Sequence, residues 1–333
     1  MTPIKECLIN KNTNITPIWL MRQAGRYLPE FREIRKVNTN FIDLCLNPNL
    51  SEEITLQPIK RFDFDAAIIF SDILMIPFGL GQNVEFKKSF GPNLGKIDLD
   101  SLFITDEQKF TKTLSPIYKL LKNLSRNEKL KNKDLIGFVG APWTLLVYMI
   151  NQVSPKNGLS SNFFTDKKLI INLLKILDKF IKVHIKNQVN SGATIIQIFD
   201  SWAGLIKSDL EQYLYRPTLS LVEYTKSLGV PVICFPRGIS DYNEFCQIIR
   251  PSMINIDYNV NPKTLIDKFD IPIQGGLDPK VLLADKEDLR NEVTKYLELF
   301  KYHPYVFNLG HGILPETQIE SVEELVKIVR NFK

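Results

Sequence analysis

Short apolar segments recur along this chain, and each is mostly apolar on both of its faces. Such segments are typical of strands buried in a parallel sheet. The eight segments cover residues 17–21, 66–70, 136–140, 193–199, 231–235, 253–257, 272–276 and 305–309. The pattern therefore predicts eight short buried strands.

Helical periodicity fills much of the sequence between these segments. The clearest helical patterns cover residues 169–189, 210–228, 289–300 and 319–332, and the short spacers between the fifth, sixth and seventh strands leave room for helices of two or three turns. The alternation predicts an α/β protein, a single (β/α)8 barrel domain of the triosephosphate isomerase type spanning residues 1–333. A doubly wound sheet is the competing architecture, but no G-x-G-x-x-G follows any strand, which removes its usual dinucleotide-binding function.

Composition and charge narrow the classes of function. The chain has 333 residues, 44% hydrophobic and 24% charged, which leaves ample material for a core. Its net charge of +5 is small and dispersed, whereas nucleic-acid-binding proteins usually carry a clustered basic stripe. The densest basic stretch, residues 119–133, carries leucines at roughly helical spacing and predicts a solvated amphipathic helix. We therefore expect no nucleic-acid partner.

The cysteines and the longest apolar stretch bear on compartment. Cys7, Cys45, Cys234 and Cys246 lie far apart without C-x-x-C spacing, which argues against disulfides or a structural zinc site. The uncharged stretch 135–154 is interrupted by two glycines and a proline, so it predicts a strand, a turn and a helix instead of a membrane span. No signal-peptide pattern opens the sequence. We expect a cytoplasmic protein with reduced thiols and no membrane partner.

Charged and polar residues follow the predicted strands, where a barrel of this type places its active site. Arg22, Asp72, Asp200, Arg237 and His311 all hold such positions. Loops are also polar simply because they are solvated, so this distribution is only a mild indication of a site.

Two arginines four residues apart follow the first predicted strand, in the order Arg22, Gln23, Ala24, Gly25, Arg26. Their side chains point the same way if the segment turns helical. A guanidinium is a planar fork that matches a carboxylate in a bidentate manner, which lysine does not reproduce. The alternative is a pair of surface ion pairs with Glu30 and Glu33. We favour a carboxylate-binding site, with Arg35 as a candidate third member.

Asp72 follows the second predicted strand and precedes the apolar residues 73–77. An unpaired carboxylate is costly in apolar surroundings, so we expect Asp72 to face the barrel mouth and a partner there. A lone aspartate at such a position is otherwise most often a helix N-cap. Tyr148 lies about a turn after the bend at Pro142, where its hydroxyl can reach the mouth, although a core aromatic fits the spacing equally well.

Among the three histidines, His311 is the candidate for chemistry. It stands between Gly310 and Gly312 after the last predicted strand. His184 lies in a helical pattern and His303 in a loop, and both have ordinary structural interpretations. Ser201 follows the fourth strand, where it can donate a hydrogen bond to a carboxylate.

Three segments resemble the uroporphyrinogen decarboxylase family: P-I-W-L-M-R-Q-A-G-R-Y-L-P-E at 17–30, G-F-V-G-A-P-W-T-L at 137–145 and N-L-G-H-G-I at 308–313. The resemblance extends over essentially the whole chain in the same order. It implies a (β/α)8 barrel, usually a homodimer, that needs no metal or organic cofactor. It also implies that the four acetate side chains of uroporphyrinogen become methyls, giving coproporphyrinogen during heme synthesis.

The resemblance also assigns roles to residues at the strand ends. It places the carboxylate-binding arginines at Arg22 and Arg26, and the carboxylate that contacts the pyrrole N–H groups at Asp72. The further substrate-contacting positions it implies are Gln23, Ala24, Gly25, Arg35, Tyr148, Phe199, Ser201 and His311. Asp72, Arg22 and Tyr148 are the expected catalytic residues, and the proton donor stays open between an arginine, Tyr148 and His311.

Two rival functions can be distinguished from decarboxylation. A zinc-dependent corrinoid or thiol methyltransferase of the same superfamily needs a cluster of thiolates and imidazole, but Cys234 lies inside the fifth strand and no cysteine is near a strand-end histidine. A non-catalytic porphyrin carrier needs the arginines but not Asp72.

Overall fold

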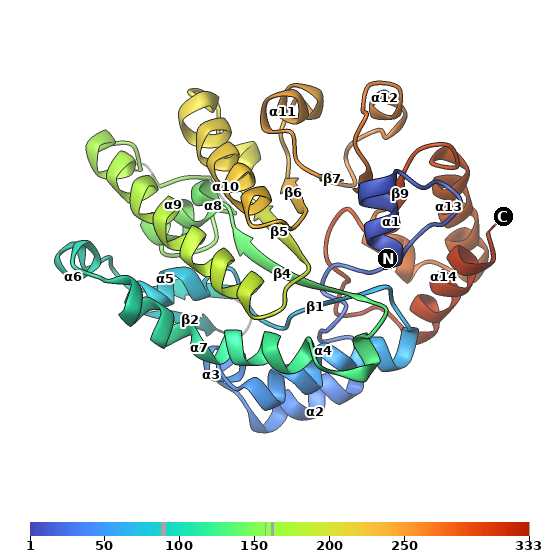
Figure 1. Cartoon of the computed structure of the whole chain (residues 1–333), viewed down its shortest axis with the longest axis horizontal. Helices are drawn as coiled ribbons and strands as arrows, with labels where there is room; N and C mark the ends of the chain where they lie inside the picture. Colours follow the sequence, from blue (N-terminus) through green and yellow to red (C-terminus); the bar gives the residue numbers. More distant parts are fainter. Residues whose placement is uncertain (88–90, 157, 161–162, 333) are drawn as a thin grey trace.

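The computed structural model describes residues 1–87, 91–156, 158–160 and 163–332. At its centre seven parallel strands form a curled sheet in the order β1-β4-β5-β6-β7-β8-β9, with helices packed outside (Figure 1). Their bounds are β1 (Ala66–Ile68), β4 (Asp134–Gly140), β5 (Ile195–Asp200), β6 (Val232–Pro236), β7 (Met253–Ile256), β8 (Ile273–Gly275) and β9 (Tyr305–Val306). All seven fall on predicted segments, most of them shorter than predicted.

The N-terminal segment around Ile18 joins the two edge strands, β9 and β1. Ile18 forms an isolated parallel bridge with Phe307. The Phe307 N–H donates to the Pro17 carbonyl at 2.7 Å, and the Trp19 N–H donates to the Phe307 carbonyl at 3.3 Å. On the other side, the Asp65 N–H donates to the Ile18 carbonyl at 2.9 Å. The segment therefore takes the eighth strand position and closes the barrel.

The prediction of a regular strand over residues 17–21 is wrong in its extent. Only Ile18 makes a bridge, because its own N–H donates to the Asp65 carboxylate at 2.7 Å instead of to a strand carbonyl. Met21 leaves the ladder as well, since its N–H donates to the Asn308 side chain at 2.9 Å. Side chains thus replace part of the backbone ladder where the barrel closes.

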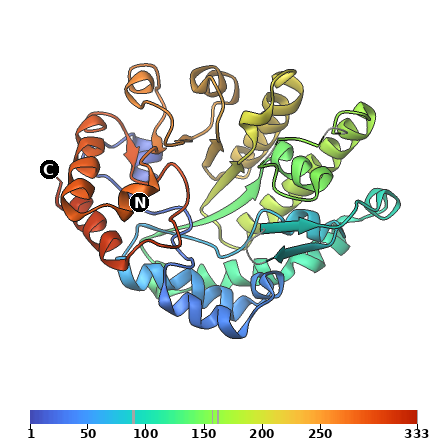
Figure 2. The ribbon, with the colours of Figure 1, turned by 180° about the vertical axis from the view of Figure 1, so that it is seen from behind.

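Long amphipathic helices cover the outside of the barrel (Figures 1 and 2). The four clearest predicted helices are confirmed, although the second begins as a π-helix, Glu211–Tyr215. The spacer after β7 holds only the single turn α12 (Lys263–Ile266), shorter than predicted. The four confirmed helices are α9 (Lys167–Asn190), α10 (Arg216–Ser227), α13 (Lys286–Leu299) and α14 (Ile319–Asn331). The remaining α-helices of the described chain are α1 (Pro3–Asn10), α2 (Pro29–Val37), α3 (Phe41–Cys45), α4 (Pro48–Phe62), α5 (Met75–Gly79), α6 (Leu99–Phe103), α7 (Glu107–Leu124), α8 (Pro142–Asn151) and α11 (Tyr242–Ile249).

The prediction of one helix over the basic stretch 119–133 is only half right. Helix α7 ends at Leu124, and a short 3-10 helix, Glu128–Leu130, follows before β4. The leucines of this stretch are nevertheless buried, as an amphipathic pattern requires. A hairpin of β2 (Val84–Lys87) and β3 (Gly91–Leu94) was not predicted; it forms a separate pair of strands beside the barrel (Figure 2).

Side chains fill the barrel below its mouth. The Trp19 indole N–H donates to Gln274 Oε1 at 2.9 Å, and Gln274 Nε2 donates to Asn255 Oδ1 at 2.6 Å. All three side chains have no exposed surface. The barrel is therefore a packed core and not a pore, so a ligand has room only at its ends.

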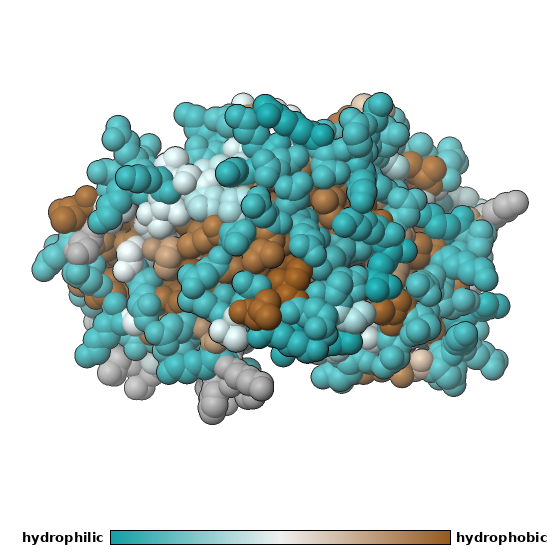
Figure 3. Space-filling model, turned by 90° about the horizontal axis from the view of Figure 1, so that it is seen from below, coloured by the Kyte–Doolittle hydropathy of each residue, from teal (hydrophilic) through white to brown (hydrophobic). Residues whose placement is uncertain are grey.

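The outer surface is mostly hydrophilic, with separate apolar patches on the face that Figure 3 shows. Among the described residues, no helix combines the length and apolar composition that a membrane crossing requires.

Candidate active site

The residues that follow the strands gather at one end of the barrel, because all strands run parallel. Arg22 follows the closing segment, Asp72 follows β1, Tyr148 lies on α8 after β4, and His311 follows β9. Electrostatic coupling joins Arg22 to both Asp72 and Tyr148, and also joins His311 to Arg22. Residues separated by up to 289 positions along the chain therefore share one barrel mouth.

The Arg22–Arg26 segment is a series of tight turns and not the helix that the spacing suggested. Helix α2 begins only at Pro29. The Gln23 N–H donates to the Leu20 carbonyl at 2.9 Å, and Arg22 adopts a left-handed backbone with φ of 61°. A non-glycine residue in this region costs about 1 kcal/mol or more, and such strain clusters at ligand sites.

Gln23 fixes this turn from below. Its Oε1 accepts from the Leu20 N–H at 3.1 Å, and its Nε2 donates to the Ala66 carbonyl at 3.0 Å. The side chain has no exposed surface, so it holds the backbone of Arg22 and Arg26 against β1 and does not line the mouth. Ala24 and Gly25 are partly exposed between the two arginines. A Cβ on Gly25 would lie 3.0 Å from the Arg22 carbonyl oxygen, so the turn is tight there.

Neither arginine has a protein partner for its guanidinium among the described residues. The two carboxylates that offered surface ion pairs are engaged elsewhere. Glu30 accepts from Arg61 at 2.5 and 2.9 Å, and Glu33 pairs with Lys36 at 2.5 Å. The alternative of structural ion pairs is therefore removed, and two unpaired cations remain at the mouth.

The Arg22 side chain keeps a solvent-accessible surface that opens into the mouth, although protein atoms surround most of it. Desolvation there lowers its pKa, Arg26 and Arg237 lower it further, and Asp72 and Tyr148 oppose the change. A Cβ on Gly312 would overlap the Arg22 Cδ, so the Arg22 stem packs directly on the Gly312 backbone. The glycine after His311 thus places the guanidinium.

Asp72 is partly buried and accepts one local hydrogen bond, from the Leu74 N–H at 2.9 Å. It does not cap α5, because Leu74 takes the N-cap position of that helix. Burial raises the pKa of Asp72 to about 6, while the Leu74 hydrogen bond and the Arg22 charge limit the rise. A carboxylate with that pKa is mostly ionised near pH 7 but easily protonated below pH 6.

Tyr148 and His311 flank the same mouth. The Tyr148 ring meets Trp202 edge to face at 6.0 Å between centroids, and burial raises the pKa of its hydroxyl. Burial and the charges of Arg22 and Arg237 lower the pKa of His311 to about 4. His311 is therefore a neutral imidazole near pH 7, able to donate a hydrogen bond but not a net charge.

The end of β5 supplies the lining residues. Phe199 is partly buried between Phe138 and Phe235, with ring centroids 5.6 and 6.4 Å away. Ser201 is partly exposed one residue beyond the end of β5. Asp200 between them is buried, and Thr144 Oγ1 donates to its Oδ1 at 2.6 Å.

The whole chain resembles known proteins. A profile of the family described as uroporphyrinogen decarboxylase (URO-D) matches residues 2–332. Uroporphyrinogen decarboxylase of Orientia tsutsugamushi (strain Ikeda) is 39% identical over 345 residues, covering 100% of this chain and 99% of the relative. That of Rickettsia bellii (strain RML369-C) is 39% identical over 336 residues, covering 98% and 97%.

The chain belongs to the uroporphyrinogen decarboxylase family. The predicted family and enzyme class, a carboxy-lyase of porphyrin and heme synthesis, are thereby confirmed. Among solved structures, a methyltransferase from Methanosarcina mazei matches with a TM-score of 0.78, covering 98% of this chain and 97% of that chain. Its 16% identity supports the predicted α/β barrel fold and nothing more.

Arg35, another residue that the decarboxylase family implies, is engaged at the end of α2. Its guanidinium donates to the Asn38 carbonyl at 2.6 Å and the Thr39 carbonyl at 3.1 Å, and lies 5.6 Å from the centre of the Phe41 ring. The buried Cys45 thiol lies within electrostatic reach of both Arg35 and Asp72. Arg35 therefore holds the loop that follows α2.

The sequence prediction omitted two charged residues that the tertiary structure brings to the site of this decarboxylase-family chain. Arg237 follows β6, and its positive charge lowers the pKa of both Arg22 and His311. Asp200 is buried with Oδ2 unbonded among the described residues, and burial raises its pKa to about 7. The only sequence signal for either was its place after an apolar segment, which many solvated loop residues share.

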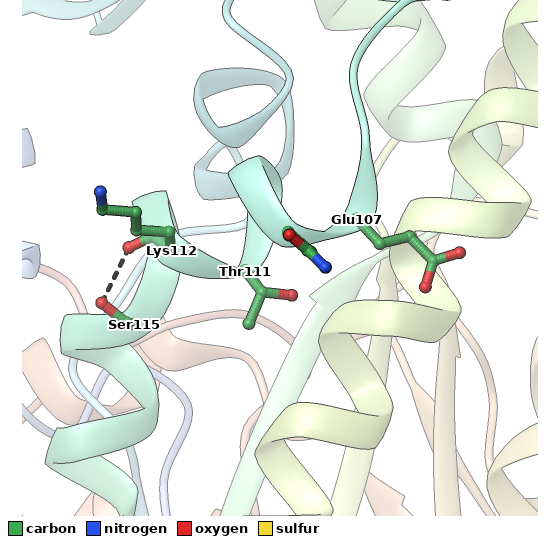
Figure 4. Close-up of a pocket in the computed structure, with 5 residues that line it drawn as sticks. Glu107, Thr111, Lys112 and Ser115 are labelled. Atoms are coloured by element: carbon green, nitrogen blue, oxygen red, sulfur yellow. Dashed lines mark hydrogen bonds between the residues drawn. The ribbon is translucent and has the colours of Figure 1, made fainter.

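Other features of the described chain do not form a second centre of chemistry. A surface pocket along α7 is lined by Glu107, Thr111, Lys112 and Ser115 on the outer ring of helices (Figure 4). Among the described residues, no three His, Cys, Asp or Glu side chains are arranged to hold a metal. Burial raises the pKa of all four cysteine thiols, which disfavours the thiolates that zinc methyl transfer requires. His184 is buried against Tyr118, and His303 against the Ile271 carbonyl.

Proposed function

We propose that this barrel mouth decarboxylates the four acetate side chains of uroporphyrinogen to methyls, giving coproporphyrinogen. One observation carries the proposal: the guanidinium of Arg22, which forms no hydrogen bond or ion pair among the described residues, lies within electrostatic reach of both Arg26 and the partly buried carboxylate of Asp72. A substrate with carboxylates at its rim and N–H donors at its centre complements both kinds of charge. The arginines bind rim carboxylates, and Asp72 accepts from the pyrrole N–H groups.

Decarboxylation requires an electron acceptor for the pair of electrons that the broken carbon–carboxylate bond leaves on the acetate methylene. Protonation of a pyrrole ring carbon creates a cationic ring, the bond to the carboxylate then breaks, and its electrons neutralise that ring. The resulting exocyclic carbon takes a second proton and becomes the methyl group, while the ring carbon returns the first. In total one acetate and one proton give one methyl and one carbon dioxide.

Asp72 stabilises the cationic ring electrostatically. At about 4 Å and an effective dielectric constant of about 20, the attraction is about 4 kcal/mol. That is roughly a thousandfold in rate. The remaining acceleration comes from holding the substrate rigidly and from a placed proton donor.

Arg22 and Tyr148 are the candidate proton donors of the site. His311, with its pKa lowered to about 4, carries no imidazolium proton near pH 7. Burial raises the pKa of the Tyr148 hydroxyl and so makes it a weaker acid. The pKa of Arg22 is instead lowered, so its guanidinium is a better acid than usual and can protonate the ring directly or through water. The substrate is oriented by the remaining residues of the mouth, Tyr148, Ser201, Phe199 and His311.

The decisive experiment is anaerobic incubation with uroporphyrinogen, followed by chromatography of the oxidised products. We expect the wild type to accumulate coproporphyrinogen with release of carbon dioxide. Asp72→Asn should bind the substrate but lose turnover by roughly a thousandfold, because the charge that stabilises the cation is gone. Asp270→Asn, the same change on the exposed loop before β8, is the matched control.

Each outcome separates this function from its rivals. A near-wild-type kcat in Asp72→Asn contradicts the electrostatic role of that carboxylate. A porphyrin carrier would bind the substrate without releasing carbon dioxide. A zinc methyltransferase would purify with stoichiometric zinc.

We further propose that the chain folds as one domain and acts as a cofactor-independent homodimer in the cytoplasm, as its family membership suggests. Sedimentation equilibrium at micromolar concentration should give twice the mass of one chain, 38.4 kDa. A monomer mass over the whole concentration range would contradict the dimer.

A further inference from the structure

We propose that Arg237 binds a second group of substrate carboxylates, on the wall of the mouth opposite Arg22 and Arg26. The inference rests on the proposed function and deepens it, because it makes peripheral carboxylates on both sides of the ligand a requirement for tight binding.

The topology places Arg237 across the mouth. Counting around the closed barrel, the Ile18 segment takes the first position, β1 the second, and β4, β5 and β6 the next three. The fifth of eight positions is directly opposite the first. Arg22 leaves the first position and Arg237 leaves the fifth, so the two guanidiniums approach a ligand from opposite sides.

The backbone of Arg237 is held on both sides. Its N–H donates to the Asp200 carbonyl at 3.0 Å, and its carbonyl accepts from the Gly204 N–H at 3.0 Å. The next residue, Gly238, has φ of +76° and donates its N–H to the Asp257 carboxylate at 2.9 Å. A Cβ on Gly204 would overlap the Gly238 carbonyl, so the loops after β5 and β6 touch backbone to backbone. The Arg237 side chain thus leaves from a rigid frame, as a binding residue requires.

The Arg237 guanidinium has no hydrogen bond or ion pair among the described residues, although the residue is half-buried. The nearby carboxylate of Asp257 is already engaged, because it accepts from Gly238, from the Asn259 N–H at 2.8 Å and from the Tyr242 hydroxyl at 3.2 Å. The positive charge of Arg237 instead lowers the pKa of both Arg22 and His311. Bringing cations together without counter-ions is unfavourable unless an anionic ligand completes the site.

The chemistry of the ligand follows from these charges. Unpaired guanidiniums on two opposite walls, with Asp72 beside one of them, fit a flat polyacid that has carboxylates around its whole rim. A ligand with acid groups on one side alone would leave Arg237 unpaired. Arg237 is therefore a specificity-determining residue toward the most highly carboxylated tetrapyrroles.

The test compares Arg237→Gln, Arg237→Lys and the control Arg126→Gln, which makes the same charge change on an exposed residue before β4, at the opposite end of the barrel. We expect Arg237→Gln to raise KM for uroporphyrinogen by about 10- to 100-fold and to change kcat by less than about threefold, because it removes a charge-assisted hydrogen bond made throughout the reaction. The KM of Arg237→Lys should lie between those of the wild type and Arg237→Gln, since lysine keeps the charge but loses the bidentate fork.

A wild-type KM in Arg237→Gln, with uroporphyrinogen still turned over, overturns the role of Arg237 and leaves the proposed function intact. If the wild type releases no carbon dioxide, the proposed function fails, and binding alone then decides on Arg237. For that purpose the Kd of uroporphyrin, which keeps the acetate carboxylates, is measured by fluorescence on all four proteins. Equal Kd values in the wild type and Arg237→Gln overturn the inference, whereas a weaker Kd in Arg237→Gln supports it. Thermal unfolding checks that each variant is folded. If Arg237→Gln does not fold, the same KM and Kd comparisons are made with Arg237→Lys.

Discussion

At the scale of single residues, the site depends on charges left without protein partners. The guanidiniums of Arg22, Arg26 and Arg237 form no ion pair within 4 Å among the described residues, while the acidic residues on neighbouring helices are paired with other cations. Asp72 carries the opposing charge, and its burial raises its pKa to about 6. The same low-polarity surroundings that raise that pKa also strengthen its attraction for a cationic ring.

The pKa of Asp72 predicts the acid side of the pH profile. The ionised carboxylate is the active form, so protonation below pH 6 should remove activity. We expect kcat/KM to fall about tenfold per pH unit below an apparent pKa near 6, measured between pH 5 and 8. Asp270→Asn, on the exposed loop before β8, should keep this limb. A profile that stays flat down to pH 5 contradicts the role of Asp72.

Arg26 should be sensitive even to a conservative change. Arg26→Lys keeps the charge but loses the planar fork, so KM for uroporphyrinogen should rise by about tenfold. Steady-state kinetics with Lys36→Arg on α2 as a control for surface substitution measures the effect. Unchanged KM and kcat in Arg26→Lys would remove it from the carboxylate site.

The sequence identified most of these residues, but it did not show which of them support the site from inside the fold. Arg22, Arg26 and Asp72 were found because they follow buried segments, and the two arginines also lie in a recognisable motif. Gln23 lies in the same motif, yet its amide is fully buried and holds the turn, which depends on contacts with Leu20 and Ala66. Arg237 was noted only as a residue after a strand and was given no role, because the charged groups near it in space come from distant parts of the chain.

At the scale of elements, the turns after the strands place the side chains. The loop after β9 runs directly under Arg22, where Gly312 contacts the arginine stem. The Ile313 N–H donates to the Met21 carbonyl at 2.9 Å, which fixes the two loops together. The strained backbone of Arg22 is therefore supported by the element that also carries His311.

Gly312→Ala tests this placement. Its added methyl overlaps the Arg22 Cδ, so the guanidinium must move, and kcat should fall at least about tenfold. The fold should lose little, because the overlap is with a flexible and partly solvated side chain. Measured kcat and unfolding free energy separate the two effects.

Gly229→Ala is the matched control before β6. Gly229 has φ of +79°, and no atom lies within 4 Å of the place that an added Cβ would take. Alanine there should therefore cost about 1–2 kcal/mol of stability through backbone strain and leave kcat unchanged. If Gly312→Ala keeps full activity, the packing of Arg22 on that glycine is not needed for catalysis.

At the scale of the whole molecule, Asp65 is central to closure of the barrel. Its carboxylate accepts from the Ile18 N–H at 2.7 Å and from Arg330 on α14 at 2.8 Å. One buried side chain thus links the N-terminal segment, the start of β1 and the last helix.

Asp65→Ala should lower the unfolding free energy by about 2–4 kcal/mol, because it leaves the buried Ile18 N–H unsatisfied and Arg330 unpaired. Denaturant unfolding measures this, and a single transition is expected for one cooperative domain. Asp270→Ala, which breaks only an exposed ion pair with Lys11, should leave stability almost unchanged. Equal stabilities for the two variants contradict the closure role.

Local sequence patterns were enough to establish the alternation of buried strands and amphipathic helices, since burial on both faces and helical periodicity are read over short windows. They also established the family, because long motifs such as residues 17–30 are specific. Tertiary contacts were needed to show that the segment around Ile18 closes the barrel, that Gln23 supports the turn from inside and that Arg237 lies within electrostatic reach of Arg22. These features depend on contacts between residues far apart in the chain, and no local pattern records such contacts.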